Sequence, residues 1–225
     1  MQVDDQLSVI IPTLNAAATL ATCLARLGSG YEVIVSDGGS TDGTGEIARQ
    51  AGARVVAGPA GRGGQLGRGA GAAAGPWLLF LHADCYLPPG WEKPVRAFMA
   101  TGGGAAVFGL RFRARGVMAR LVGAWAGFRT RAFGLPFGDQ GLLISSRLYK
   151  EIGGFPDVPL MEDIAMARAL GRGRITLLPV AVETGAERYL ADGWIRHGAR
   201  NMIRQVRFLS GAEPALLAKS YGTRR

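Results

Sequence analysis

The chain has 225 residues, of which 48% are hydrophobic and 19% charged, which is the composition of a folded globular protein and excludes a disordered one. Its formal net charge of +9 is compatible with three kinds of partner: nucleic acid, an anionic membrane surface or a phosphorylated small molecule. Two cysteines exclude a disulfide framework, and no apolar stretch is long enough to span a bilayer.

The first half of the chain alternates short apolar runs with segments of helical pattern. Strands are expected at 7–11, 32–36, 53–57 and 77–82, and helices at 16–27 and 43–51, with a glycine-rich loop and an alanine-rich helix before the last strand. Strands that are apolar throughout and alternate with helices are typical of a mainly parallel sheet covered on both faces. The predicted fold class is therefore α/β, of the doubly wound kind.

The second half is less regular but continues in the same single domain, 1–225. The expected elements, in order, are a strand at 105–112, a helix over 116–133, a strand at 141–145, a helix over 161–170, a strand pair or kinked strand at 175–182, and a basic amphipathic helix over 190–209. The acidic start MQVDDQ is unlike a basic secretory leader, so a cytoplasmic location is expected.

Polar or glycine-rich sequence follows each of the first four strands. The segments are PTLN (12–15), SDGGSTDG (36–43), GPAGRGGQ (58–65) and HAD (82–84). Ligands of parallel α/β sheets bind beyond the carboxyl ends of the strands, where these segments converge. The sequence therefore predicts one shared site along this rim.

The second and third of these segments each allow two interpretations. Asp37 could accept hydrogen bonds from a base or a ribose, or it could belong to a plain turn that caps the next helix. The segment 58–65 lacks the Gly-Lys-Ser/Thr ending of a P-loop. It could present Arg62 and backbone N–H groups to a phosphate, or it could be a flexible surface loop.

Two groups of acidic residues could take part in cation binding or in catalysis. In HAD, Asp84 with His82 on the same side could hold a divalent cation against a diphosphate; alternatively, Asp84 caps a helix that begins near Pro88. In MEDIAM, Glu162 and Asp163 fall at a helix N-terminus, where the helix dipole already favours negative charge. The alternative is a carboxylate that accepts a proton from a hydroxyl nucleophile.

In this order the segments resemble the family 2 glycosyltransferases, which have the GT-A fold. The matching residues are IPTLN, DGGSTDGT, the arginine loop, the strand-end acid and GGFPDVPLMED, over about residues 7–170. The variants GRGGQ and FLHADC resemble a bacterial subgroup of small, soluble members. The resemblance implies an inverting transfer of sugar from a nucleotide-diphosphate sugar to a hydroxyl acceptor. In it, 1–100 would be the nucleotide-sugar-binding half and 101–225 the acceptor-side half.

The resemblance also implies roles for single residues. Those expected to bind the nucleotide sugar are Pro12, Thr13, Asn15, Asp37, Arg62, Gln65 and His82. Asp84 would hold a divalent cation, Mn²⁺ or Mg²⁺, and Asp163 would be the general base with Glu162 beside it. His82 departs from the family, whose Asp-X-Asp element begins with an acid, and imidazole suits Mn²⁺ or Zn²⁺ better than Mg²⁺. His197 is predicted as a further metal ligand, with a solvated helix-face histidine as the alternative.

The acceptor is not identified by the sequence. Asp139, in PFGDQG, is predicted to serve it. The helical segments 116–133 and 190–209 mix arginine with tryptophan and phenylalanine, a composition found at membrane surfaces. This favours a lipid-linked acceptor and peripheral contact with the inner face of the membrane; the alternative is a homodimer interface or ordinary solvated helices. Nucleic acid is not expected as a partner, because the basic residues form no known reading motif.

Two other classes of function stay open at this point. A sugar-1-phosphate nucleotidyltransferase would share the nucleotide-binding sheet, although the chain lacks a lysine-bearing glycine signature near its N-terminus. A non-catalytic nucleotide or polyanion binder would account for the positive charge and for His82 in place of an acid.

Overall fold

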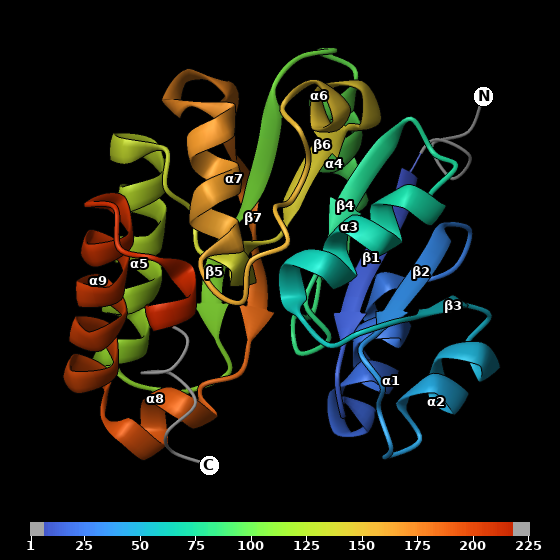
Figure 1. The fold of residues 1–225 in the computed structure, drawn as a ribbon, viewed down its shortest axis with the longest axis horizontal. Helices are drawn as coiled ribbons and strands as arrows, with labels where there is room; N and C mark the ends of the chain where they lie inside the picture. The colour runs from blue at the N-terminus through green and yellow to red at the C-terminus, as the bar shows by residue number, and fades with distance from the viewer. Residues whose placement is uncertain (1–6, 218–225) are drawn as a thin grey trace.

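The computed structural model describes residues 7–217 as one seven-stranded sheet flanked by helices (Figure 1). The strands are β1 (Leu7–Thr13), β2 (Glu32–Asp37), β3 (Arg54–Ala57), β4 (Trp77–Phe80), β5 (Ala105–Phe112), β6 (Leu142–Ser145) and β7 (Ile175–Thr184). The helices are α1 (Ala17–Leu27), α2 (Thr44–Gln50), α3 (Arg62–Ala72), α4 (Glu92–Met99), α5 (Val117–Phe133), α6 (Ser146–Glu151), α7 (Glu162–Leu170), α8 (Glu187–Asp192) and α9 (Trp194–Leu209), with 3-10 turns η2 (Gly138–Gln140) and η3 (Arg172–Arg174).

The strand order is β3-β2-β1-β4-β6-β5-β7, and the sheet is mainly parallel as predicted. β1 pairs in parallel with β2 and β4, and β5 in parallel with β7, whereas β6 runs antiparallel between β4 and β5. The N-terminal end of β6 therefore lies at the edge where the parallel strands end. Any residue just before β6 is brought to the same rim as the residues just after β4.

Alternating strand residues build one apolar core on each face of the sheet. On one face, Val9 and Leu79 pack with side chains from α1, α4 and α5. On the other face, Ile10 and Phe80 pack with side chains from α3, α6 and α7. The period of two residues follows from the strand pleat, so the nearly continuous apolar runs seen in the sequence supply both cores. The α/β prediction is confirmed.

The glycine-rich segment forms a helix where a loop was expected. α3 begins at Arg62, so that prediction is wrong for the second half of GPAGRGGQ. Two of its glycines make close packing feasible: a Cβ on Gly63 would lie 2.1 Å from the carbonyl oxygen of Pro156, and one on Gly69 would lie 2.3 Å from Ile10 Cγ2. The glycines thus let α3 pack closely against β1 and the 153–159 loop.

Two further boundaries differ from the prediction, and the kinked-strand alternative for 175–182 is confirmed. The helix expected over 190–209 is broken at Gly193 (φ 82°) into α8 and α9. β4 ends at Phe80, and the following helix starts at Glu92, so Asp84 does not cap it. The segment around Pro179 is a single kinked strand: β7 shifts register against β5 between Val107 and Gly109, where proline has no N–H to donate. No helix among the described residues has both the length and the apolar character to cross a membrane.

Candidate functional site

The loops after β1 and β2 form one hydrogen-bonded unit. Thr13 Oγ1 donates to Oδ1 of Asp37 over 2.9 Å, and the N–H groups of Gly39 and Ser40 donate to Oδ2 over 3.0 and 2.8 Å. Ser40 Oγ donates to Oδ1 of the same carboxylate over 2.5 Å and accepts the backbone N–H of Asn15. The two strand ends are therefore held together by a single acid.

Asp37 is fully engaged by these bonds. Its side chain is buried, and a carboxylate offers about four lone-pair positions, which the four bonds fill. Burial alone would raise the pKa of Asp37, but the bonds from Ser40, Thr13 and Gly39 outweigh it and lower the pKa, so the group stays ionised at neutral pH. Asp37 thus shapes the rim by holding its loop, and a direct bond to a base or ribose stays a prediction.

The side chain of Gln65 is likewise held by hydrogen bonds within the protein. It is buried on α3, and its Nε2 donates to the carbonyl oxygens of Thr13 and Ser36 over 2.7 and 2.9 Å. Its Oε1 accepts the N–H of Gly61 over 3.2 Å. The side chain therefore ties the ends of β1 and β2 to the start of α3. Pro12 lies half-buried in the same rim, in register with Ser36.

Arg62 and Glu162 connect the two halves of the chain. Arg62 Nη1, on the first turn of α3, lies 3.3 Å from Oε1 of Glu162 on the first turn of α7. The Glu162 side chain is almost fully buried, whereas that of Arg62 is 42% exposed. Glu162 therefore positions the arginine, and the guanidinium still faces solvent on one side, where an anion could approach it.

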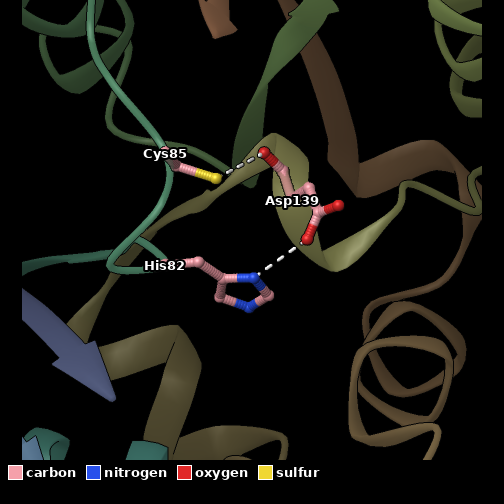
Figure 2. Close-up of side chains that lie close together, drawn as sticks. All are labelled: His82, Cys85 and Asp139. Atoms are coloured by element: carbon pink, nitrogen blue, oxygen red, sulfur yellow. Dashed lines mark hydrogen bonds and ion pairs between the residues drawn. The ribbon is translucent and has the colours of Figure 1, made fainter. Parts of the chain in front are cut away.

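His82 and Asp139 meet because β6 is antiparallel. His82 follows β4, Asp139 lies in η2 just before β6, and Phe80 pairs with Leu142 between them. His82 Nδ1 is 3.0 Å from Oδ1 of Asp139 (Figure 2). An ionised Asp139 can only accept a hydrogen bond, so the bond places a proton on Nδ1 of His82, while Nε2 is directed away from Asp139. Sequence analysis assigned Asp139 to the acceptor, whereas the structure pairs it with His82.

The electrostatics of this pair favour an ionised acid. Burial by itself would raise the pKa of Asp139, but the hydrogen bond and charge of His82, followed by the charges of Arg62 and Arg188, lower it overall. Asp139 therefore supplies, from another part of the chain, a negative charge beside the position where His82 replaces an acid.

Ligand atoms of His82, Cys85 and Asp139 lie within 4.8 Å of one another, which is the spacing of a metal site. The Cys85 thiol is buried and points at the carbonyl oxygen of Asp139, 3.4 Å away (Figure 2). Burial and the nearby acids raise the pKa of Cys85 well above its usual value, so the thiol stays protonated. Imidazole nitrogen and carboxylate oxygen are then the available donors, a set that suits Mn²⁺.

Two predicted ligands lie outside this group. Asp84 is half-buried in the turn after His82; its carbonyl oxygen accepts a bond of 2.7 Å from Arg113, and its Oδ1 lies 3.8 Å from Cys85 Sγ. His197, on α9, has its Nδ1 3.0 Å from Oδ2 of Asp192. The structure thus pairs His197 within the α8–α9 region and does not bring it to His82.

Asp163 stands at the start of α7, facing the His82 loop. Its Oδ2 accepts the N–H of Gly138 over 3.0 Å, and its Oδ1 accepts the N–H of Ile164 over 2.8 Å. A Cβ placed on Gly138 would lie 3.4 Å from Oδ2 of Asp163 and 3.5 Å from Nε2 of His82, so both groups border the same glycine. Burial and the neighbouring Glu162 raise the pKa of Asp163 against the opposing charge of Arg62.

The backbone just before these acids is strained. Met161 has φ 69°, a left-handed conformation that is uncommon for residues other than glycine. Its side chain is buried against Ile164 and Leu217, which holds the conformation in place. Strain of this kind costs on the order of 1–3 kcal/mol and gathers at functional sites. It fixes the direction in which Glu162 and Asp163 leave the loop.

A narrow cavity of about 40 Å³ lies below these groups. Its walls are mostly apolar side chains of the second core, and its polar lining comes from His82, Glu162 and Asp163. A space of this size holds water and no sugar ring, so any sugar substrate would lie above it, at the strand ends.

The sequence profile of glycosyl transferase family 2 matches residues 8–144, which is more than half of the chain. The chain belongs to this family. The matched range contains the Thr13–Asp37 unit, α3, His82 and Asp139; the α7 acids lie beyond it.

Relatives and solved structures agree with this assignment. A PGL/p-HBAD biosynthesis glycosyltransferase of Mycobacterium tuberculosis is 44% identical over 88 residues, covering 34% of each chain, so this chain spans about a third of that relative's length. The mannosyltransferase PcManGT from Pyrobaculum calidifontis, in complex with GDP-Man and Mn²⁺, aligns with a TM-score of 0.70 at 19% identity, covering 96% of this chain and 69% of that one. S. aureus TarS 1-349, in complex with UDP-GlcNAc, aligns with a TM-score of 0.63 at 20% identity over 80% and 58%. The GT-A fold expected for this family 2 chain is confirmed.

Some residues of the family 2 site were missed by sequence analysis. Ser40 bonds to Asp37 twice, and Gly138 gives its N–H to Asp163. The role of Ser40 could have been predicted from DGGSTDGT, because the serine follows Asp37 by three residues, a spacing at which an aspartate side chain accepts hydrogen bonds within a turn. The role of Gly138 and the pairing of Asp139 depend on the direction of β6, which the sequence does not state.

Proposed function

We propose that the chain is an inverting glycosyltransferase that moves a sugar from a nucleotide-diphosphate sugar to a hydroxyl acceptor, assisted by a divalent cation. The observation that carries the proposal is the position of Asp163. Its carboxylate borders Gly138 together with His82, follows Glu162, which holds Arg62, and has a raised pKa. A carboxylate in such surroundings is suited to accept a proton from a hydroxyl group.

The donor side would be formed by residues 1–100. The Thr13–Asp37–Ser40 unit and Asn15 give the rim a fixed shape over which a nucleotide can lie. Arg62 faces solvent at the first turn of α3, where its guanidinium can pair with a diphosphate oxygen. Positive charge at this place would stabilise the negative charge that grows on the departing diphosphate.

The cation would be held by Nε2 of His82, with Asp84 in the turn that follows it as the second candidate ligand, and Asp139 would support the His82 ring from its other nitrogen. When bound, Mn²⁺ or Mg²⁺ supplies a positive charge that stabilises the leaving diphosphate. Asp139 orients the His82 ring. Its carboxylate also supplies a negative charge near the position where His82 replaces the first acid of the Asp-X-Asp element. In many metal sites, a histidine ligand has its other ring nitrogen hydrogen-bonded to a carboxylate, which fixes the direction of the ring.

The acceptor side would be formed by residues 101–225. Asp163 would take the proton of the acceptor hydroxyl as its oxygen attacks the anomeric carbon from the face opposite the diphosphate. The new glycosidic bond forms as the bond to the diphosphate breaks, so a single displacement inverts the anomeric configuration. The hydrogen bonds from Gly138 and Ile164 keep the carboxylate directed toward that position.

The comparisons support the choice of donor. PcManGT is described in complex with GDP-Man and Mn²⁺ and TarS in complex with UDP-GlcNAc, and both share this fold. By analogy of fold, a nucleotide-diphosphate sugar and Mn²⁺ are the first ligands to test for this chain.

The experiment is donor turnover with a panel of UDP and GDP sugars, each with Mn²⁺ and with EDTA. We expect release of free nucleoside diphosphate that depends on the cation, and stabilisation of the fold by the matching nucleoside diphosphate in thermal unfolding. Release of pyrophosphate from sugar 1-phosphate and nucleoside triphosphate would identify a nucleotidyltransferase instead. Stabilisation by nucleotide without turnover of any donor would identify a binding protein.

Replacing Asp139 by Asn should weaken Mn²⁺ binding. The loss of the carboxylate charge and of the fixed His82 orientation is expected to raise the Kd about 10- to 100-fold. The measurement is titration of the purified protein with Mn²⁺, read by electron paramagnetic resonance of the free ion, so it does not depend on turnover.

The matched control for this change is Asp192→Asn. Asp192 forms the other histidine–aspartate pair, with His197, at the same 3.0 Å distance. It should leave the Kd for Mn²⁺ unchanged. Equal Mn²⁺ affinity in the wild type and Asp139→Asn would remove Asp139 from the cation site.

A further inference from the structure

α5 and α9 lie side by side at one end of the molecule and carry apolar side chains that the rest of the described chain does not cover (Figure 1). On α5 the exposed residues are Val117, Leu121, Trp125, Phe128 and Phe133; on α9 they are Ile195, Met202, Ile203, Val206 and Leu209. Most recur three or four positions apart, so each helix has one continuous apolar stripe. Ile195 is 77% exposed and Val117 69%, which is unusual for residues of this kind. We refer to the two stripes together as the α5–α9 face.

An arginine stripe runs beside the apolar stripe on each helix. On α9 it consists of Arg196, Arg200, Arg204 and Arg207, again three or four positions apart, and on α5 of the exposed Arg120 and Arg131. Neither helix contains an aspartate or a glutamate, and Asp192 of α8 reaches the stripe, with its Oδ2 3.4 Å from Arg200 Nη1. The α5–α9 face is therefore apolar and strongly positive at once.

A groove between the two helices extends from this face as far as Phe137. It is a cavity of about 440 Å³ lined mainly by apolar side chains, among them Leu121, Trp125 and Met202. Phe137 lines both this groove and the cavity below Asp163. Buried Arg129 fixes Phe137 from below: its guanidinium lies 3.9 Å from the ring centroid and donates to the carbonyl oxygen of Pro136 over 2.9 Å.

We propose that the α5–α9 face binds the surface of an anionic lipid bilayer, with both helices lying in the headgroup region. An amphipathic helix with apolar residues on one side and arginines next to them is suited to this position, since the side chains enter the acyl boundary and the arginines reach the anionic headgroups. The charge of the face argues against a second copy of the chain, because two such faces would repel each other. The groove ends at Phe137, the side chain that also lines the cavity below Asp163.

The test is co-sedimentation with vesicles of phosphatidylcholine alone and of an equimolar mixture with phosphatidylglycerol. The protein should pellet with the anionic vesicles and remain in solution with the neutral ones, and added salt should weaken the binding. Replacing both Arg196 and Arg207 by Gln should lower the affinity roughly 20-fold, given the contribution expected of each arginine near such a surface. Ile203→Asp, which places a charge on the apolar stripe, should also reduce pelleting.

The control has the same change of charge elsewhere. Arg26 and Arg49 are exposed on α1 and α2, and replacing both by Gln should leave pelleting unchanged. If the control and the α9 variant lose pelleting to the same extent, the net charge of the protein alone explains the binding, and the proposal is overturned.

Trp125 reports whether the face itself touches lipid. It is 40% exposed, whereas Trp77 and Trp91 are buried. Anionic vesicles should shift the tryptophan emission to shorter wavelength, and Trp125→Phe should remove most of this shift. Absence of pelleting with anionic vesicles, together with a dimer in sedimentation velocity that Ile203→Asp dissociates, would assign the face to a second copy and overturn the proposal.

Discussion

Asp163→Asn is expected to lower kcat by about 10²–10⁴-fold while the affinity for the donor changes little. The amide has the shape of the carboxylate and can still accept a hydrogen bond from Gly138 or Ile164, but it cannot take a proton from the acceptor. The measurement is steady-state turnover together with donor binding by calorimetry. Glu151→Gln, at an exposed residue paired with Arg174, is the control and should retain full activity. Normal turnover of Asp163→Asn would refute its role as the base.

The same substitution should also make the fold more stable at neutral pH. Burial and Glu162 raise the pKa of Asp163 in the folded chain above its unfolded value, so the native state loses stability as the pH rises from the unfolded pKa to the folded one and stays destabilised above it. Asn carries no such charge. The Tm of Asp163→Asn should therefore exceed that of the wild type at neutral pH, and the difference should shrink as the pH falls below about 4, where the unfolded carboxyl also protonates. A lower Tm for the variant at neutral pH would contradict the raised pKa.

Gly63→Ala is expected to destabilise the fold by at least about 2 kcal/mol, which for a chain of this size lowers Tm by roughly 4–8 °C. The added Cβ would lie 2.1 Å from the carbonyl oxygen of Pro156, a backbone atom that can move only with the 153–159 loop. Displacing this loop also shifts the segment that leads to Glu162, so activity should fall with stability. Thermal unfolding followed by circular dichroism measures the effect.

Gly67→Ala provides the matched control on the same helix. Nothing lies within 4 Å of a Cβ at this position, so the substitution removes backbone freedom of the unfolded chain without a clash. It should stabilise the fold by about 0.5–1 kcal/mol, the usual difference between alanine and glycine in a helix interior. Destabilisation of equal size by both substitutions would mean that α3 does not pack on the loop as described.

The sequence predicted the parallel half of the sheet and its polar rim because both depend on local patterns. Apolar runs bounded by glycine and acids identify strands that are buried on both faces, and the carboxyl ends of such strands converge. β5 was predicted with its observed bounds, Ala105–Phe112. The α7 acids were also placed correctly at a helix N-terminus.

The remaining features depend on contacts between distant parts of the chain. The first turn of α3 was taken for a loop because its glycines have low intrinsic helix propensity, and the close approach of Pro156 to Gly63 explains why glycine stands there. The pairing of Asp139 with His82 was not predicted, because the antiparallel direction of β6 that brings them together has no local signature. Gln65 has three hydrogen bonds that fix it in the scaffold, and two of them reach Thr13 and Ser36, which are far from it in the sequence.

The central claim is that the rim of β1 and β2, the His82–Asp139 pair and the α7 acids surround one substrate. A crystal structure of the protein with a nucleoside diphosphate sugar analogue and Mn²⁺ tests it most directly. We expect the diphosphate between Arg62 and His82, the anomalous signal of Mn²⁺ within coordination distance of His82 or Asp84, and the anomeric carbon facing Asp163. A nucleotide bound at another place, with Asp163 remote from the sugar, would contradict it.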